Sequence, residues 1–159
     1  MSPEDPAHVE MFRNAYLFRN LLPHELQPFI ERSSIVDYSP NELIIAEGDA
    51  GEELFLILGG SVRVTKATSE GIEQVIGFLR EGDFFGEMAL LDRRPRSASV
   101  IAHGNVQLAR LRHDDIYTIF RIDPATGLKV VRTFAEVLSL RLRETNDRLK
   151  TVLLLESTF

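Results

Sequence analysis

Apolar residues recur at helical spacing in the N-terminal part of the chain, from about residue 7 to residue 32. Pro23 stands where a helix can begin, because the first helical position needs no backbone N–H donor. One apolar face is formed by Leu22, Leu26, Phe29 and Ile30. The spacing therefore predicts helices ahead of the first strand.

Between residues 33 and 112 the pattern changes to short runs rich in Val, Ile and Phe, separated by Gly and Asp. Strands are expected at residues 34–38, 42–46, 53–58, 61–67, 73–80, 97–102 and 105–111. Gly59-Gly60 and His103-Gly104-Asn105 have the composition of hairpin turns. Many short strands at regular spacing favour an antiparallel jelly-roll barrel, and with the helices they predict an α+β fold.

The helical period returns at His113, with a short helix to about residue 121 and a break at Asp123-Pro124. An unbroken helix then extends to about residue 155, roughly 45 Å in length. Seven of its residues step alternately by four and three, namely Val131, Ala135, Leu138, Leu142, Thr145, Leu149 and Val152. We call them the seam, because this spacing is a heptad pattern.

A second apolar stripe on this helix covers only its first half and is expected to pack on the barrel; it consists of Val130, Phe134 and Val137. One interpretation is a single-faced amphipathic helix lying along its own domain. We favour a parallel or antiparallel helix pair across a homodimer, because one small barrel cannot cover both stripes along ~45 Å. The expected dimer contacts are Val131, Leu138, Leu142, Leu149 and Val152.

The pattern divides the chain into a barrel with its N-terminal helices, residues 7–124, and the long helix, residues 125–155. The chain has 159 residues, of which 44% are hydrophobic and 26% charged, values typical of one globular domain. It has no cysteine, which excludes disulfides and thiolate metal sites. The net charge of −6 argues against a generally basic nucleic-acid binder, although a small anion needs only local positive charge.

We expect a cytoplasmic protein with no membrane association. No stretch approaches the ~18 apolar residues of a membrane span. The beginning of the chain, Met1-Ser-Pro-Glu-Asp-Pro, is acidic and interrupted by proline, which does not fit a secretory signal.

Enzyme chemistry has no visible basis in the sequence. A jelly roll suggests a cupin-like metalloenzyme as one alternative, but the four histidines, His8, His24, His103 and His113, form no close pair. Nucleophile-elbow and Walker-type motifs are also absent from the sequence. We therefore expect a protein that is not an enzyme and holds no metal.

Residues 82–100, which we call the cassette, have the chemistry of an anion site. Gly86 lets the backbone approach a ligand closely, and the residues after it can form one helical turn whose first N–H groups are unpaired. Arg96 follows Pro95 at the start of an expected strand, which would hold it rigidly, and its planar guanidinium can donate two charge-assisted hydrogen bonds to a phosphate. Ser97 adds a hydroxyl donor.

Glu87 lies beside this anion site and would repel a phosphate unless it faces another part of the ligand. An ionised carboxylate only accepts hydrogen bonds, which suits sugar hydroxyls. Phosphate, ribose and an apolar barrel wall together describe a nucleotide. One arginine without lysine or metal fits a cyclic diester better than a triphosphate.

The cassette resembles the phosphate-binding cassette of cyclic-nucleotide-binding domains, in Phe85-Gly-Glu-Met-Ala-Leu and Pro95-Arg-Ser-Ala. The resemblance extends to Glu47-Gly48-Asp49, Phe55-Leu-Ile and Gly60-Ser-Val-Arg-Val, and covers about residues 18–152. It is nearest to the sensor half of catabolite-activator-type regulators.

This resemblance implies a role for each matching residue. Gly86 and the backbone of Met88 and Ala89 would hold the cyclic phosphate, with Arg96 and Ser97 on its exocyclic oxygens. Glu87 would bind the ribose 2′-hydroxyl. Val64 and Ile76 would line the base pocket, Thr145 would contact adenine in its own subunit, and Asn146 would reach the partner's ligand.

We therefore expect a cyclic-nucleotide receptor, for cAMP more than cGMP, that transmits binding through its dimeric C-terminal helix to an unidentified protein. The alternative is the sensor half of a DNA-binding regulator. Such regulators continue into a helix-turn-helix, whereas only residues 156–159 follow the long helix here, so we expect no direct DNA binding by this chain. The initial Met1 and the absence of a vector-like tail favour a natural single-domain protein.

Overall fold

Three N-terminal helical segments open the fold of the computed structural model, which describes residues 5–158. They are α1 (Pro6–Asn14), the 3-10 helix η1 (Tyr16–Phe18) and α2 (Pro23–Arg32). The carboxylate of Glu25 accepts a hydrogen bond from the backbone N–H of Leu22, which stabilises the start of α2. Met1–Glu4 and Phe159, on which the expectations about the chain ends rest, lie outside the described residues.

Eight antiparallel strands follow: β1 (Ser34–Tyr38), β2 (Leu43–Ile45), β3 (Glu53–Gly59), β4 (Ser61–Ala67), β5 (Glu73–Arg80), β6 (Phe84–Phe85), β7 (Ser99–Ala102) and β8 (Val106–Arg112). They form two four-stranded sheets, in the orders β1-β8-β3-β6 and β2-β7-β4-β5. Two such sheets fit the jelly-roll prediction, but they do not close into a barrel as expected, because no ladder joins them among the described residues. The antiparallel α+β class is confirmed.

Two differences from the predicted strands matter for the site. The two-residue strand β6 was missed, because a Phe-Phe pair between Asp83 and Gly86 is too short to show alternation. The strand expected at 97–102 begins only at Ser99, so Arg96 and Ser97 lie in the loop before it.

Strand β3 separates two hydrophobic clusters, because its side chains alternate between the faces of its sheet and both faces are covered. One cluster packs between the sheets and includes the stacked rings of Phe55 and Phe85, whose centroids are 5.1 Å apart. The other packs the sheet against the helices. It buries the predicted stripe of Val130, Phe134 and Val137, which confirms that stripe as core.

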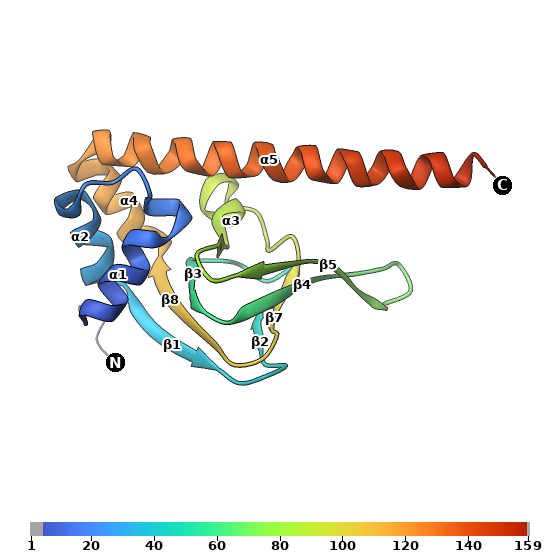
Figure 1. The fold of residues 1–159 in the computed structure, drawn as a ribbon, viewed down its shortest axis with the longest axis horizontal. Coiled ribbons are helices and arrows are strands. Elements are labelled where there is room, and N and C mark those ends of the chain that lie inside the picture. The colour runs from blue at the N-terminus through green and yellow to red at the C-terminus, as the bar shows by residue number, and fades with distance from the viewer. Residues whose placement is uncertain (1–4, 159) are drawn as a thin grey trace.

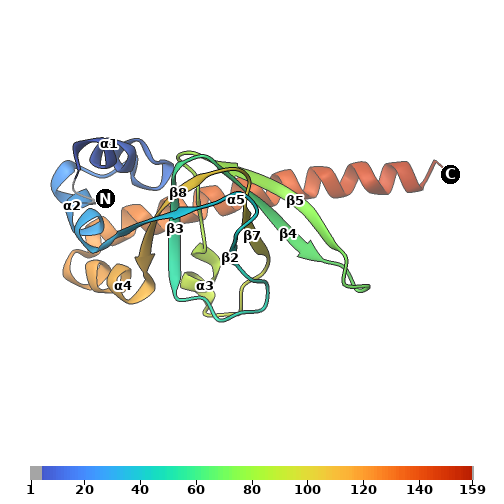
Figure 2. The same ribbon diagram turned by 90° about the horizontal axis from the view of Figure 1, so that it is seen from below.

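The remaining helices are α3 (Glu87–Asp92), α4 (His113–Ile122) and α5 (Pro124–Glu156). The break at Asp123-Pro124 is present, and the Asp123 side chain accepts from the backbone N–H of Thr126 to cap α5. At 33 residues, α5 is about 50 Å long. Helices α1, α2 and α4 gather at one end of the sheets, while α5 crosses over α3 and continues past the body (Figures 1 and 2).

The seam lies on the outer side of α5, where most of its large side chains are solvent-exposed: Val131, Leu142, Leu149 and Val152. The consecutive leucines 153–155 are exposed as well. In the part of the chain that the structure describes, no helix is long and apolar enough to cross a membrane.

Candidate functional site

A cavity of about 410 Å³ lies between the cassette, strands β4, β5 and β7, and helix α5. Nine of the ten residues expected at the site line it: all except Asn146, which is exposed on α5. These nine residues span 81 positions of the sequence, from Val64 to Thr145. We call it the α5 cavity.

The cassette enters α3 through a turn that only glycine fits. Gly86 has φ +91°, and a Cβ there would lie 2.6 Å from the carbonyl oxygen of Glu53. Helix α3 begins at Glu87, and its first backbone N–H groups have no acceptor within the helix. Ala89 is buried, Met88 is 46% exposed, and both line the cavity.

Arg96 is held through hydrogen bonds of its backbone to the loop between β2 and β3, rather than by a strand. Its N–H donates to the Asp49 carbonyl (2.8 Å), and its carbonyl accepts from the Gly48 N–H (2.9 Å). Gly51 packs directly on the side chain, because a Cβ at Gly51 would lie 2.2 Å from Arg96 Nε. The prediction that Arg96 starts a strand was therefore wrong, and the loop between β2 and β3 restrains it instead.

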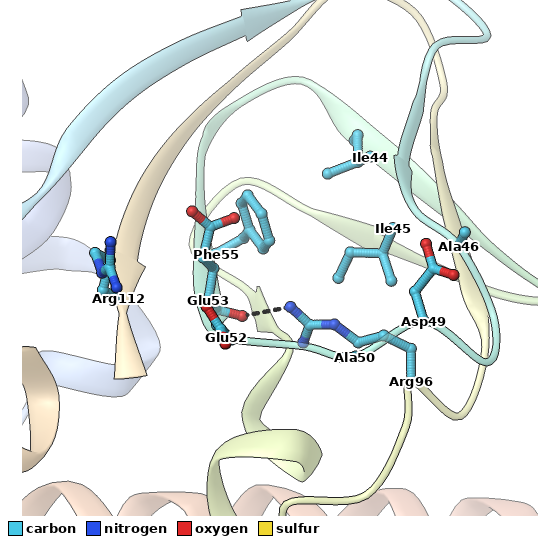
Figure 3. Close-up of a pocket in the computed structure, with 10 residues that line it drawn as sticks. All are labelled: Ile44, Ile45, Ala46, Asp49, Ala50, Glu52, Glu53, Phe55, Arg96 and Arg112. Atoms are coloured by element: carbon cyan, nitrogen blue, oxygen red, sulfur yellow. Dashed lines mark hydrogen bonds between the residues drawn. The ribbon is translucent and has the colours of Figure 1, made fainter. Parts of the chain in front are cut away.

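The Arg96 guanidinium donates through Nη2 to the Glu53 carbonyl (2.8 Å) and through Nη1 to the Gly86 carbonyl (3.2 Å). It also lines a second cavity of about 360 Å³, whose wall includes Asp49 and Glu52 (Figure 3). Burial lowers the pKa of Arg96, and the carboxylates of Glu53 and Glu87 oppose that shift. The group stays cationic, since guanidinium does not deprotonate in proteins.

Glu87 is only 3% exposed and pairs with a residue that the sequence did not single out. Its Oε1 accepts from Arg141 Nη1 of α5 at 2.6 Å, and Arg141 Nη2 donates to the Phe84 carbonyl at 3.0 Å. Burial raises the pKa of Glu87, while the Arg141 charge opposes the rise. Arg141 lies four residues after Val137 in the buried stripe, and a charged residue continuing an apolar stripe was the signal that could have found it.

Two further α5 residues line the cavity and were missed: Glu144 and Arg148. Arg148 Nη1 donates to the Ile76 carbonyl at 2.9 Å, which ties α5 to strand β5. The Thr145 hydroxyl donates to the Arg141 carbonyl at 2.8 Å, so its proton is used within the helix while its lone pairs remain available as acceptors. Ser97 lies at the mouth, 3.5 Å from the Met88 sulfur.

Between residues 5 and 158, no group of three or more His, Asp or Glu side chains could hold a metal ion. The lining of the α5 cavity offers hydrogen bonding and charge: backbone donors and Arg96 at one end, the Glu87 carboxylate beside them, and apolar strand residues opposite α5.

The family described as "Cyclic nucleotide-binding domain" matches residues 35–123. Among curated proteins, a cAMP-dependent protein kinase regulatory subunit from Mycosarcoma maydis is 42% identical over 96 residues, which are 60% of this chain and 18% of that protein. A cyclic AMP receptor protein from Thermus thermophilus is 34% identical over 128 residues, 80% of this chain and 57% of that protein. The chain thus spans only part of these relatives' length.

Among solved structures, a cyclic nucleotide-binding domain from Methylobacillus flagellatus superposes with a TM-score of 0.79 at 30% identity. The superposition covers 89% of this chain and 80% of that one. The likeness therefore extends beyond the segment that matches the family.

Proposed function

Since this chain belongs to the cyclic nucleotide-binding domain family, we propose that it is a non-enzymatic receptor that binds cAMP, in preference to cGMP, in the α5 cavity. The observation that carries the proposal is the convergence of Gly86, Glu87 and Arg96 on one cavity roofed by α5. A volume of about 410 Å³ lies in the range of small-molecule sites.

The cyclic phosphate occupies the cassette end of the cavity in this proposal. The backbone N–H groups of Gly86, Met88 and Ala89 approach it without side-chain obstruction, because Gly86 has no Cβ. Arg96 supplies the compensating charge, and the Ser97 hydroxyl a further donor. The restraint of Arg96 by the loop between β2 and β3 supports this role, since a fixed guanidinium loses little freedom on binding.

The ribose 2′-hydroxyl donates to Glu87. The carboxylate is desolvated and paired with Arg141, so in its ionised form it offers the hydroxyl a charge-assisted hydrogen bond at low dielectric. Because Arg141 belongs to α5, a ligand that binds Glu87 is connected to this helix through the Glu87–Arg141 ion pair.

The base lies between the strands and α5. Val64 and Ile76 provide apolar contact, and the Thr145 oxygen accepts from the adenine amino group. Asn146 lies on the exposed side of α5, from which it would reach the cavity of a partner subunit. The acceptor lone pairs of Thr145 favour adenine, because guanine presents a carbonyl oxygen in place of the 6-amino group.

Signal transmission in this proposal uses a homodimer formed by the α5 seam, with residues 7–124 as the binding body and 125–155 as the transmitting helix. The exposure of Leu142, Leu149 and Val152 supports it, because a contiguous apolar row on a water-soluble helix favours burial against a partner. The ligand would stabilise the conformation in which α5 closes the cavity, and so shift the population toward it.

Calorimetric titration with cAMP, cGMP and 5′-AMP tests the proposal. We expect a single site per chain with cAMP tightest, and much weaker binding of 5′-AMP, whose dianionic open phosphate does not match one arginine and a neutral backbone turn. If none of the three nucleotides binds, or if 5′-AMP equals cAMP, the assigned function is wrong.

The Glu87–Arg141 pair is also expected to stabilise the fold. Arg141→Leu leaves the Glu87 carboxylate buried without its cation, and we expect a loss of about 1–3 kcal/mol, less than for a fully buried pair because the Arg141 side chain is 32% exposed. Urea unfolding measures the free energy. Glu87→Gln in the Arg141→Leu background should restore part of it, and Arg143→Leu, on an exposed position nearby, serves as the control. An Arg141→Leu variant as stable as the parent would contradict a structural role for the pair.

A further inference from the structure

His113, the first residue of α4, is a buried polar group without an evident purpose in the fold. The residue is 7% exposed, and its backbone N–H donates to the Glu52 carbonyl at 2.8 Å. The ring nitrogen Nε2 is shielded from water and has no hydrogen-bond partner among the described residues. A buried polar atom left unpaired costs free energy, and such an atom often marks a functional device.

The surroundings of the imidazole identify what it can bond. It faces the carbonyl oxygens of Glu53 and Gly86 and the guanidinium of Arg96. These are the same two carbonyls that accept from Arg96 Nη2 and Nη1. The His113 imidazole therefore lies beside the same pair of acceptors to which the Arg96 guanidinium already donates.

We propose that His113 is a positioning residue: it donates to the Gly86 and Glu53 carbonyls when a bound cyclic phosphate draws the Arg96 guanidinium toward the α5 cavity. This inference rests on the proposed function. In the ligand-free protein Arg96 satisfies both carbonyls and Nε2 remains unpaired. In the complex the imidazole donates to the carbonyls and keeps the turn in the shape that the phosphate requires. The unpaired nitrogen therefore raises the free energy of the ligand-free protein but not that of the complex.

The exchange of donors also couples a proton to the ligand. Burial lowers the pKa of His113, and the positive charge of Arg96 lowers it further, while the two carbonyls and Asp114 oppose both effects. An anionic phosphate bound to Arg96 offsets the effect of the Arg96 charge. Ligand binding therefore raises the pKa of His113 and is accompanied by uptake of a proton. Affinity should then increase as the pH falls toward the pKa of the complex.

Several other charged side chains surround the imidazole. Besides Arg96 and Asp114, the cavity that His113 lines carries charged side chains from the cassette, the loop before β3 and the end of β8: Arg93, Arg94, Glu52 and Arg112. All of them are present in the parent and in any variant at position 113, so a comparison of these proteins isolates the imidazole. Glu87, whose pKa is raised, is common to the parent and to any variant at position 113.

The test compares cAMP titrations of the parent, His113→Gln and His113→Phe at several pH values between 5.8 and 7.8. Glutamine retains a donor near the position of Nε2, and phenylalanine retains only the ring shape. We expect cAMP binding about fivefold to tenfold weaker in His113→Phe and within about twofold of the parent in His113→Gln. The increase in affinity at low pH should be present in the parent and absent from both variants.

Thermal unfolding of the ligand-free proteins separates positioning from simple packing. His113→Phe removes the unpaired nitrogen, so we expect it to be at least as stable as the parent without ligand and to gain less stability from cAMP. Equal cAMP affinity in the parent and His113→Phe, or the same pH dependence in all three proteins, would overturn the inference. Absence of cyclic-nucleotide binding by the parent would instead overturn the proposed function.

Discussion

Replacing Arg96 with alanine is expected to weaken cAMP binding by about one to three orders of magnitude, more than any other single substitution among the residues that line the α5 cavity. Arg96 is the cation that the cassette presents to the α5 cavity from its loop, and it is half-buried, so its interaction with a phosphate is less screened than at the surface. Calorimetry or displacement of a fluorescent cyclic nucleotide measures the change.

Two matched variants make this result specific. Arg94→Ala removes an exposed arginine from the same loop, and we expect it to change the affinity by less than about twofold. Arg96→Lys keeps the charge but not the planar fork, and should recover only part of the affinity. Since Arg96 also holds the Gly86 and Glu53 carbonyls, thermal unfolding must first show that each variant is folded. Parent-like binding by folded Arg96→Ala protein is incompatible with the proposed phosphate site.

Introducing charge into the seam is expected to convert a dimer into a monomer. Leu142 and Leu149 are 61% and 56% exposed, and in the proposed dimer both are buried against the partner helix. Glutamate at both positions would place unpaired charges in an apolar interface, which costs several kcal/mol. Light scattering at about 10 µM should therefore give the mass of a dimer for the parent and of a monomer for Leu142→Glu with Leu149→Glu.

Leu140 provides the control for this experiment. It is 54% exposed, comparable to the seam leucines, but it does not belong to the seam. Leu140→Glu should leave the dimer intact. A monomeric parent, or a double variant that stays dimeric, would refute the helix pair and leave α5 as an amphipathic helix of its own domain.

The cassette was predictable because its chemistry is local. Gly86, Glu87 and Arg96 lie within eleven consecutive residues, and the turn, the short helix and the guanidinium each follow from residue type. Apart from β6, the strands were predicted within two residues because alternation and turn residues are local as well. The family match and the shared fold agree with this part of the prediction.

The parts of the site and of the fold that the sequence did not predict depend on tertiary contacts between distant segments. Nothing next to Arg141 or Arg148 in the sequence shows that one reaches Glu87, 54 residues away, and the other the Ile76 carbonyl, 72 residues away. The division into two sheets depends on which strands pair with one another, and the alternation of residues within a strand does not reveal its partners. The clamp on Arg96 likewise comes from Gly48 and Asp49, which the sequence indicated only as a family motif.

The two halves of α5 are held by different forces. Thr126, Val130, Phe134 and Val137 bury the first half in the core, and the Asp123 cap fixes its beginning. Beyond Arg148 the contact with the body ends, and every residue from 149 to 158 is exposed. A helical segment of that length is marginal alone in water. In an isolated chain its amides should exchange with solvent by local fraying, whereas those of the first half should exchange only when the core opens, so α5 is one helix in shape but two units in cooperativity.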